Sequence, residues 1–160
     1  MLSIRNFLVP TDFSEQSVAA FHLASALARD HHAALTILHV RETPVVPFAE
    51  FGAVPPVDVP SRTALLEKMA EFEPPDDATG VEYLVADGIP AEEIVKVASD
   101  RGCDLIVMGT HGRSWLKHRL FGSVTEDVVR RARCPVMVVK APAAAQELAV
   151  SESARRATGD

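Results

Sequence analysis

Cysteine and tryptophan are scarce in this chain of 160 residues, which holds two cysteines and one tryptophan. Two cysteines cannot form a disulfide framework, and Cys103 and Cys134 lie too far apart in the sequence for a CxxC metal site. Unpaired cysteines are usually buried as small apolar side chains, and reduced thiols are typical of the cytoplasm. We therefore predict a cytoplasmic protein.

Long apolar runs and an excess of positive charge are missing as well. The most apolar helix candidate, residues 17–28, is too short to cross a bilayer, and the N-terminus enters Ile4–Val9 without a signal-type stretch. The formal net charge is −6, which argues against a general nucleic-acid binder because such proteins neutralise phosphates. We therefore expect neither a membrane nor a nucleic acid as partner.

Signatures of common enzymes and metal sites are also lacking. The six histidines show no HExxH or related ligand spacing, and no GxxxxGK[ST] phosphate loop occurs. His111 is a candidate general base, but no Asp, Ser or Cys stands at a recognisable spacing from it, so a structural or solvated histidine is favoured. We predict no catalytic residue and no zinc site.

Apolar strand segments alternate with helical segments along most of the chain. We expect strands at Ile4–Val9, Ala34–Val40, Val81–Val85, Asp104–Met108 and Val136–Lys140. We expect helices at Ser14–Asp30, Ser61–Phe72, Ala91–Asp100 and Ser123–Arg133. Strands that are apolar nearly throughout belong to parallel sheets covered on both faces. The pattern therefore predicts a single doubly wound α/β domain with right-handed crossovers.

Two segments fall outside this alternation. Thr43–Pro60 contains five prolines and is predicted to be a long loop. Residues 141–160 mix alanine, serine, charges and glycine, and we expect a flexible C-terminal tail. The predicted domain therefore spans residues 1–140.

The most informative pattern is Gly109 and Gly112, followed after nine residues by Gly122 and Ser123. An apolar strand precedes the pattern and a helical segment follows it. Glycines let the backbone approach an anion closely, and the first turn of a helix presents unpaired N–H groups. The Ser123 hydroxyl adds a donor to a phosphate oxygen or a ligand to a metal. The pattern therefore predicts a phosphate-binding turn.

Positive charge is concentrated around this turn. Residues 109–140 hold seven lysines and arginines against two acidic residues, which suits a small polyphosphate. Arg113, Lys117 and Arg119 lie in the nine-residue connection and are candidates to neutralise phosphate charge, with an ordinary solvated loop as the alternative. Arg113 is the favoured candidate because it follows Gly112.

The loop after the first strand, Pro10–Ser14, is the other candidate half of the site. Doubly wound sheets bind ligands beyond the carboxyl ends of their strands, where the strand order reverses. If the first and fourth strands are neighbours, Asp12 faces the glycine turn and can hold ribose hydroxyls or a phosphate-bound cation. The alternative is that Asp12 only caps the first helix or satisfies a turn. His39 and Val40 lie on the same side and offer backbone groups and an apolar wall to a base.

The chain resembles the universal stress protein family, in the subset whose members carry the glycine pattern and bind ATP. The resemblance covers most of residues 4–140 and is carried by Phe7–Ser14, Leu38–Val40, Gly88–Ile94, Asp104–Arg113, Phe121–Val124 and Cys134–Val139. It implies a five-stranded parallel sheet in the order 3-2-1-4-5, with ATP where the first and fourth strands meet. It also implies homodimers, often paired through the last strand, Val136–Lys140.

The resemblance further implies roles for single residues. Asp12 would hold the ribose or a metal, the Val40 backbone would read the adenine edge, and Met108 and Gly109 would flank the nucleoside. Gly112 and the start of the fourth helix would surround the phosphates. With the loop residues above, the predicted nucleotide site comprises Pro10, Thr11, Asp12, Val40, Met108, Gly109, Gly112, Arg113, Gly122, Ser123 and Val124.

One position departs from the family pattern. Many members have a small residue two positions after the arginine that follows the second glycine, whereas this chain has Trp115. A bulky ring at this position would shield the phosphates, stiffen the loop or pack on a partner.

Three functions remain open at this point. The first is an ATP-binding stress-response protein that carries Mg²⁺ and acts as a nucleotide-dependent regulator, with slow hydrolysis or self-phosphorylation at most. The second is a dimeric interaction module whose nucleotide site is empty or vestigial. The third is a true nucleotide hydrolase or nucleotidyl-transferring enzyme, which fold analogy alone supports.

Overall fold

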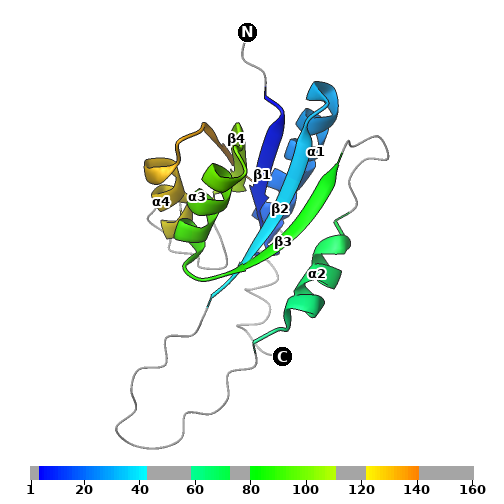
Figure 1. The fold of residues 1–160 in the computed structure, drawn as a ribbon, viewed down its shortest axis with the longest axis vertical. Coiled ribbons are helices and arrows are strands. Elements are labelled where there is room, and N and C mark those ends of the chain that lie inside the picture. The colour runs from blue at the N-terminus through cyan, green and yellow to red at the C-terminus, as the bar shows by residue number, and fades with distance from the viewer. Residues whose placement is uncertain (1–3, 43–58, 73–79, 111–121, 141–160) are drawn as a thin grey trace, which may run out of the picture.

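The computed structural model describes residues 4–42, 59–72, 80–110 and 122–140, where strands and helices alternate as predicted (Figure 1). Every predicted element is present, and its ends differ from the prediction by at most two residues. The elements are β1 Asn6–Pro10, α1 Glu15–His31, β2 Ala34–Arg41, α2 Arg62–Ala70, β3 Val81–Asp87, α3 Pro90–Asp100, β4 Leu105–Gly109, α4 Ser123–Arg131 and β5 Val136–Val139.

The five strands form one parallel sheet in the order β3-β2-β1-β4-β5, which confirms the order that the family resemblance implied. From β1 the chain moves outward to β2 and β3. It then returns to the other side of β1 to form β4 and β5. The strand order therefore reverses between β1 and β4, where Leu8 pairs with Ile106.

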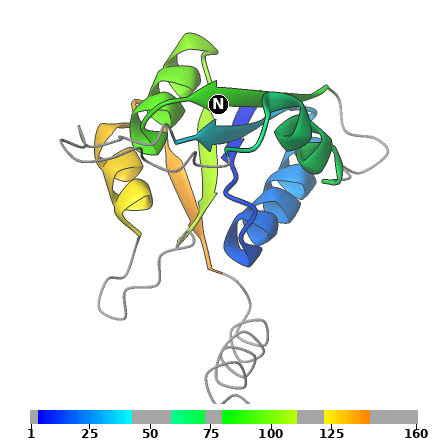
Figure 2. The ribbon, with the colours of Figure 1, turned by 90° about the horizontal axis from the view of Figure 1, so that it is seen from below.

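Helices cover both faces of the sheet. Figures 1 and 2 show α1 and α2 on one face and α3 and α4 on the other. The core on the first face includes Phe7, Val9, Phe21, Ile37, Met69 and Val107. The core on the second face includes Leu8, Leu38, Ile94, Ile106 and Val128. Successive residues of β1 thus enter opposite cores, as the two-residue period of a strand requires.

The helices begin at residues with different capping chemistry. The Ser14 hydroxyl accepts a hydrogen bond from the Ser17 N–H, and Ser61 caps α2 in the same way. Pro90 stands in the first turn of α3. The N-cap of α4 is Gly122, which supplies no side-chain hydrogen bond to the helix. Among the helices of the described residues, α4 is thus the one whose N-cap residue has no side chain.

Both cysteines are free, and Cys103 is buried as predicted whereas Cys134 is half-buried. Within the part of the chain that the structure describes, no helix combines the length and the apolar character needed to cross a membrane. Most of the predicted Thr43–Pro60 loop and the whole predicted tail at 141–160 lie outside the described residues.

Two leucines test the packing of this fold. Leu8 is fully buried in β1, whereas Leu23 is 39% exposed on α1. We expect Leu8→Ala to lower the free energy of unfolding by about 2–5 kcal/mol, because it leaves a cavity between tightly packed strands and helices. Leu23→Ala should cost less than about 1 kcal/mol. Urea unfolding of both variants measures the difference, and equal losses would contradict the described core.

Candidate functional site

The carboxyl ends of β1 and β4 bring the two predicted halves of the site to one edge of the sheet. Thr11 and Asp12 directly follow β1, and Thr110 follows β4. The Gly122 N–H donates to the Thr110 carbonyl over 2.8 Å, so α4 begins next to the end of β4. The Thr110 N–H in turn donates to the Val139 carbonyl over 3.0 Å. Ligands of doubly wound sheets bind at such an edge.

The close approach at Gly109 is made by the protein itself. A Cβ atom on Gly109 would lie 2.8 Å from the backbone carbonyl carbon of Gln16. The first turn of α1 therefore packs directly on the end of β4. The sequence pattern predicts that Gly109 lets the backbone approach an anion. The structure shows that the contact with Gln16 also requires glycine at this position. The Thr125 hydroxyl donates to the Gly109 carbonyl over 3.0 Å, which fixes the other side of the turn.

The N-terminus of α4 offers backbone donors at this edge. The first hydrogen bond of the helix runs from the Glu126 N–H to the Gly122 carbonyl over 3.0 Å. The N–H groups of Ser123, Val124 and Thr125 therefore precede the helical hydrogen-bond ladder, and they carry the positive end of the helix dipole. The Gly122 N–H already donates to the Thr110 carbonyl, so it is not one of these donors. Ser123 is exposed and Val124 is half-buried.

Asp12 is held in a tight turn. One of its carboxylate oxygens, Oδ1, accepts hydrogen bonds from the Ser14 N–H at 3.0 Å and from the Ser14 hydroxyl at 2.5 Å. The turn role that the sequence left open for Asp12 is therefore present. A carboxylate has two oxygens and about four acceptor positions, so this turn is compatible with a further contact to a ligand.

Thr11 anchors the same loop to the neighbouring strand. Its N–H donates to the Leu38 carbonyl over 2.8 Å, and its carbonyl lies 2.8 Å from Nδ1 of His39. Its hydroxyl accepts from the Phe13 N–H at 3.1 Å. Phe13 has a φ of 63°, a left-handed conformation that bulky residues rarely adopt. The sequence pattern did not reveal the contacts of the His39 and Phe13 side chains, although an aromatic residue next to Asp12 was a possible signal.

The remaining predicted residues fall into two groups. Pro10 and Met108 are buried at the ends of β1 and β4, and Val40 is half-buried near the end of β2. The described chain thus brings the predicted residues of β1, β2, β4 and α4 to the same edge. The others lie outside the described residues, and they are Gly112 and Arg113, together with His111, Trp115, Lys117 and Arg119.

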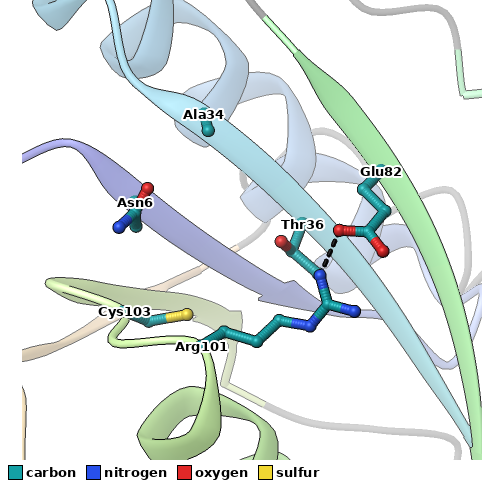
Figure 3. A pocket seen from close by; sticks show the side chains of 6 residues that line it. All are labelled: Asn6, Ala34, Thr36, Glu82, Arg101 and Cys103. Atoms are coloured by element: carbon teal, nitrogen blue, oxygen red, sulfur yellow. Dashed lines mark hydrogen bonds and ion pairs between the residues drawn. The ribbon is translucent and has the colours of Figure 1, made fainter.

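A separate pocket lies near the amino ends of the strands, away from the carboxyl ends that carry Asp12 (Figure 3). It has a volume of about 310 Å³ and is lined by Asn6, Ala34, Thr36, Glu82, Arg101 and Cys103, near the amino ends of the strands. Glu82 and Arg101 form an ion pair there. Burial raises the pKa of the Cys103 thiol to about 11, so the thiol is protonated at neutral pH. This pocket is distinct from the edge that holds Asp12.

Metal-ligating side chains do not cluster in the described residues, since no three of His, Cys, Asp or Glu come together there. Mg²⁺ bound with a nucleotide needs no such cluster, because it is usually held by one or two carboxylates together with phosphate oxygens and water. Asp12 supplies one carboxylate at this edge of the sheet, which meets that requirement.

The parallel strand order, with helices on both faces of the sheet, defines a doubly wound α/β domain. The family model of the universal stress proteins matches residues 3–140. The chain therefore belongs to the universal stress protein family.

Individual relatives agree with this assignment. Universal stress protein MJ0531 of Methanocaldococcus jannaschii is 35% identical over 147 residues, which cover 86% of this chain and 83% of the relative. Universal stress protein MJ0577 of the same organism is 53% identical over 60 residues, only 37% of its length. The structure of MJ0577 covers 86% of this chain with a TM-score of 0.64 and 30% identity over 96% of its own chain.

A solved structure of a universal stress protein in complex with cAMP is also similar. It is 27% identical, with a TM-score of 0.64, and the match covers 88% of this chain and 99% of that one. A nucleotide is thus bound by one protein of closely similar fold.

Gly109 provides a test of the packing at this edge. We expect Gly109→Asn to lower the free energy of unfolding by about 1–3 kcal/mol, because its Cβ would overlap the backbone of Gln16. Gly80→Asn is the matched control, since a Cβ on Gly80 meets nothing within 4 Å and asparagine tolerates its φ of +72°. Urea unfolding measures both. A Gly109→Asn variant as stable as the control would contradict the close contact between α1 and β4.

Proposed function

We propose that this chain is an ATP-binding protein of the cytoplasmic stress response, which acts as a nucleotide-dependent regulator rather than as a fast catalyst. The observation that carries the proposal is the start of α4, whose glycine N-cap is hydrogen-bonded to the end of β4 across from the Asp12 turn. Family membership and the similar protein in complex with cAMP support it.

In this proposal the nucleoside lies over the ends of β1, β2 and β4. The Val40 backbone reads the adenine edge, Asp12 holds ribose hydroxyls, and Met108 and Gly109 flank the nucleoside. Pro10 and Thr11 complete the loop that carries Asp12. Hydrogen bonds from the backbone to the base edge would favour adenine, while a carboxylate is a strong acceptor for two ribose hydroxyls.

The phosphates lie at the N-terminus of α4 in this proposal. The N–H groups of Ser123 and Val124 and the Ser123 hydroxyl donate to phosphate oxygens. Gly122 keeps the approach open, and Gly112 and Arg113 contribute from outside the described residues. Mg²⁺ would neutralise part of the phosphate charge, with the Asp12 carboxylate and Ser123 hydroxyl as candidate ligands.

A regulatory role fits the chemistry of these residues better than rapid turnover does. One oxygen of the Asp12 carboxylate already accepts two hydrogen bonds from Ser14, so this oxygen serves the turn and is not set aside for catalysis. Phosphoryl transfer depends on charge neutralisation and positioning, so slow hydrolysis or self-phosphorylation is compatible with the proposal. The nucleotide would then act by changing which partners the protein binds.

The exposed edge strand β5 is the proposed homodimer surface. Its four residues are all apolar, yet none of them is buried, and Met137 is 36% exposed. Val129 on the neighbouring α4 is 49% exposed. Unpaired strand edges readily pair with another chain. The same surface favours the second candidate function, a dimeric interaction module in which the nucleotide site is vestigial.

Calorimetric titration with Mg·ATP tests the nucleotide proposal. We expect the wild-type protein to bind ATP in the micromolar range and Gly122→Val to weaken binding at least about tenfold, because a branched side chain blocks the phosphates. The backbone of Gly122, with φ −65° and ψ 157°, is one that valine readily adopts.

Thermal unfolding of the Gly122→Val variant controls for its fold, and Asp12→Asn provides an independent test because its amide oxygen can preserve the turn while the charge is lost. Equal affinity of Gly122→Val and wild type would contradict the phosphate site. Absence of ATP binding by the wild type would favour the interaction module.

Sedimentation equilibrium tests the dimer proposal. We expect Met137→Lys to shift the protein toward the monomer, because a charge would be buried between two copies of β5. Ile89→Lys is the control, since Ile89 is 62% exposed at the start of α3 and lies away from β5. If both variants stay dimeric, β5 is not the interface.

A further inference from the structure

His39 lies next to Val40 on β2, but its side chain points to the other face of the sheet. Leu35 and Ile37, which precede it at intervals of two residues, belong to the core under α1 and α2. The His39 ring packs on the Phe13 ring, with the ring centres 4.7 Å apart. The His39 side chain therefore contacts the loop after β1 from the face of the sheet that α1 and α2 cover.

The hydrogen bond between His39 and Thr11 has one possible direction. A carbonyl oxygen only accepts, so Nδ1 of His39 must carry a proton and donate to the Thr11 carbonyl at 2.8 Å. The Thr11 N–H donates to the Leu38 carbonyl, also at 2.8 Å. Both backbone groups of Thr11 are thus tied to β2, one residue beyond the pairing of Pro10 with Leu38.

Phe13, the residue after Asp12, is held by contacts of its side chain. Its left-handed backbone, with a φ of 63°, is costly for a bulky residue and has to be maintained by surrounding contacts. Its ring packs on His39 and stacks at 6.1 Å on Phe72, and Nζ of Lys68 lies 4.2 Å from the ring centre. A cation over an aromatic face adds attraction.

Asp12 thus stands between two residues that His39 contacts directly. Its backbone is fixed by the Thr11 carbonyl before it and by the Phe13 ring after it. His39 is also covalently adjacent to Val40. His39 therefore connects both neighbours of Asp12 to Val40.

We propose that His39 is a positioning residue of the nucleotide site, which sets the spacing between Asp12 and the Val40 backbone for one nucleoside. The inference rests on the proposed function, because Asp12 and Val40 are the groups assigned there to the ribose and the adenine. His39 acts on Asp12 through the Thr11 carbonyl and the Phe13 ring. It therefore governs recognition of the nucleoside, whereas the start of α4 governs recognition of the phosphates.

Two substitutions separate the hydrogen bond from the bulk of the side chain. His39→Leu keeps a similar volume and removes the donor. His39→Asn keeps a donor, because its amide nitrogen takes nearly the place of Nδ1. Phe72→Leu is the packing control, since Phe72 contacts Phe13 in the same aromatic group but lies apart from the hydrogen bond to the Thr11 carbonyl.

The affinities to be measured are those for Mg·ATP and, by competition, for inorganic tripolyphosphate, which contains only the phosphate part. We expect His39→Leu to weaken ATP binding about tenfold, the effect of one hydrogen bond, and to leave tripolyphosphate binding unchanged. His39→Asn should restore most of the ATP affinity, and Phe72→Leu should stay close to wild type.

A double-mutant cycle with Asp12→Asn tests whether His39 acts through Asp12. In the Asp12→Asn background, His39→Leu should cause little additional loss of ATP affinity, because coupled residues are not additive. Additive losses, an equal loss of tripolyphosphate affinity, or equal effects of the leucine and asparagine variants would each overturn the proposal.

Hydrogen exchange of the Phe13 amide provides a readout without any ligand. This amide donates to the Thr11 hydroxyl, so its protection should fall in His39→Leu and persist in His39→Asn. Unchanged protection in His39→Leu would show that His39 does not hold the loop. If the wild type itself fails to bind ATP, the proposed function fails, and the exchange experiment still decides whether His39 positions Asp12.

Discussion

Burial of β1 on both faces is the constraint on which the rest of this structure depends. Phe7, Leu8 and Val9 are each at most 1% exposed, so neither face of the strand tolerates water. Helices must therefore cover both faces, and a strand must lie on each side of β1. The chain meets this requirement by building outward to β3 and then returning to β4. Because the chain returns in this way, the strand order reverses between β1 and β4. A ligand is expected at the carboxyl ends of these two strands.

The two halves of the candidate site are supported in different ways. The start of α4 is attached to the end of β4 through the backbone, from Gly122 to Thr110. The Asp12 turn is attached to β2 through the backbone of Thr11 and through the His39 side chain. Both attachments lead to strands that are paired with another strand on each side. A ligand that bridges the two halves would thus contact groups whose positions are set before it binds.

Much of this fold was predictable from local sequence. Apolar runs located the strands, and Ser14, Ser61 and Pro90 marked helix starts because their chemistry is local. The strand order came from the family resemblance, since no periodicity determines which strands are neighbours. The contacts of Thr11 with His39 were not predictable, because they join residues 28 positions apart in the sequence. The left-handed Phe13 was missed for a related reason, since the rings that pack on it, His39 and Phe72, come from distant parts of the sequence. The ligand roles of Asp12, Val40 and Ser123 remain predictions.

The hydrogen bond from Gly122 to Thr110 also has an evolutionary consequence. It joins the two ends of the connection formed by residues 111–121, so the start of α4 is located by β4 and not by the connection itself. The entropy of closing a loop grows only slowly with its length. A change in the length of this connection would therefore cost little stability and would leave the start of α4 beside β4. Selection on the nine-residue spacing from Gly112 to Gly122 would then act through binding and not through folding.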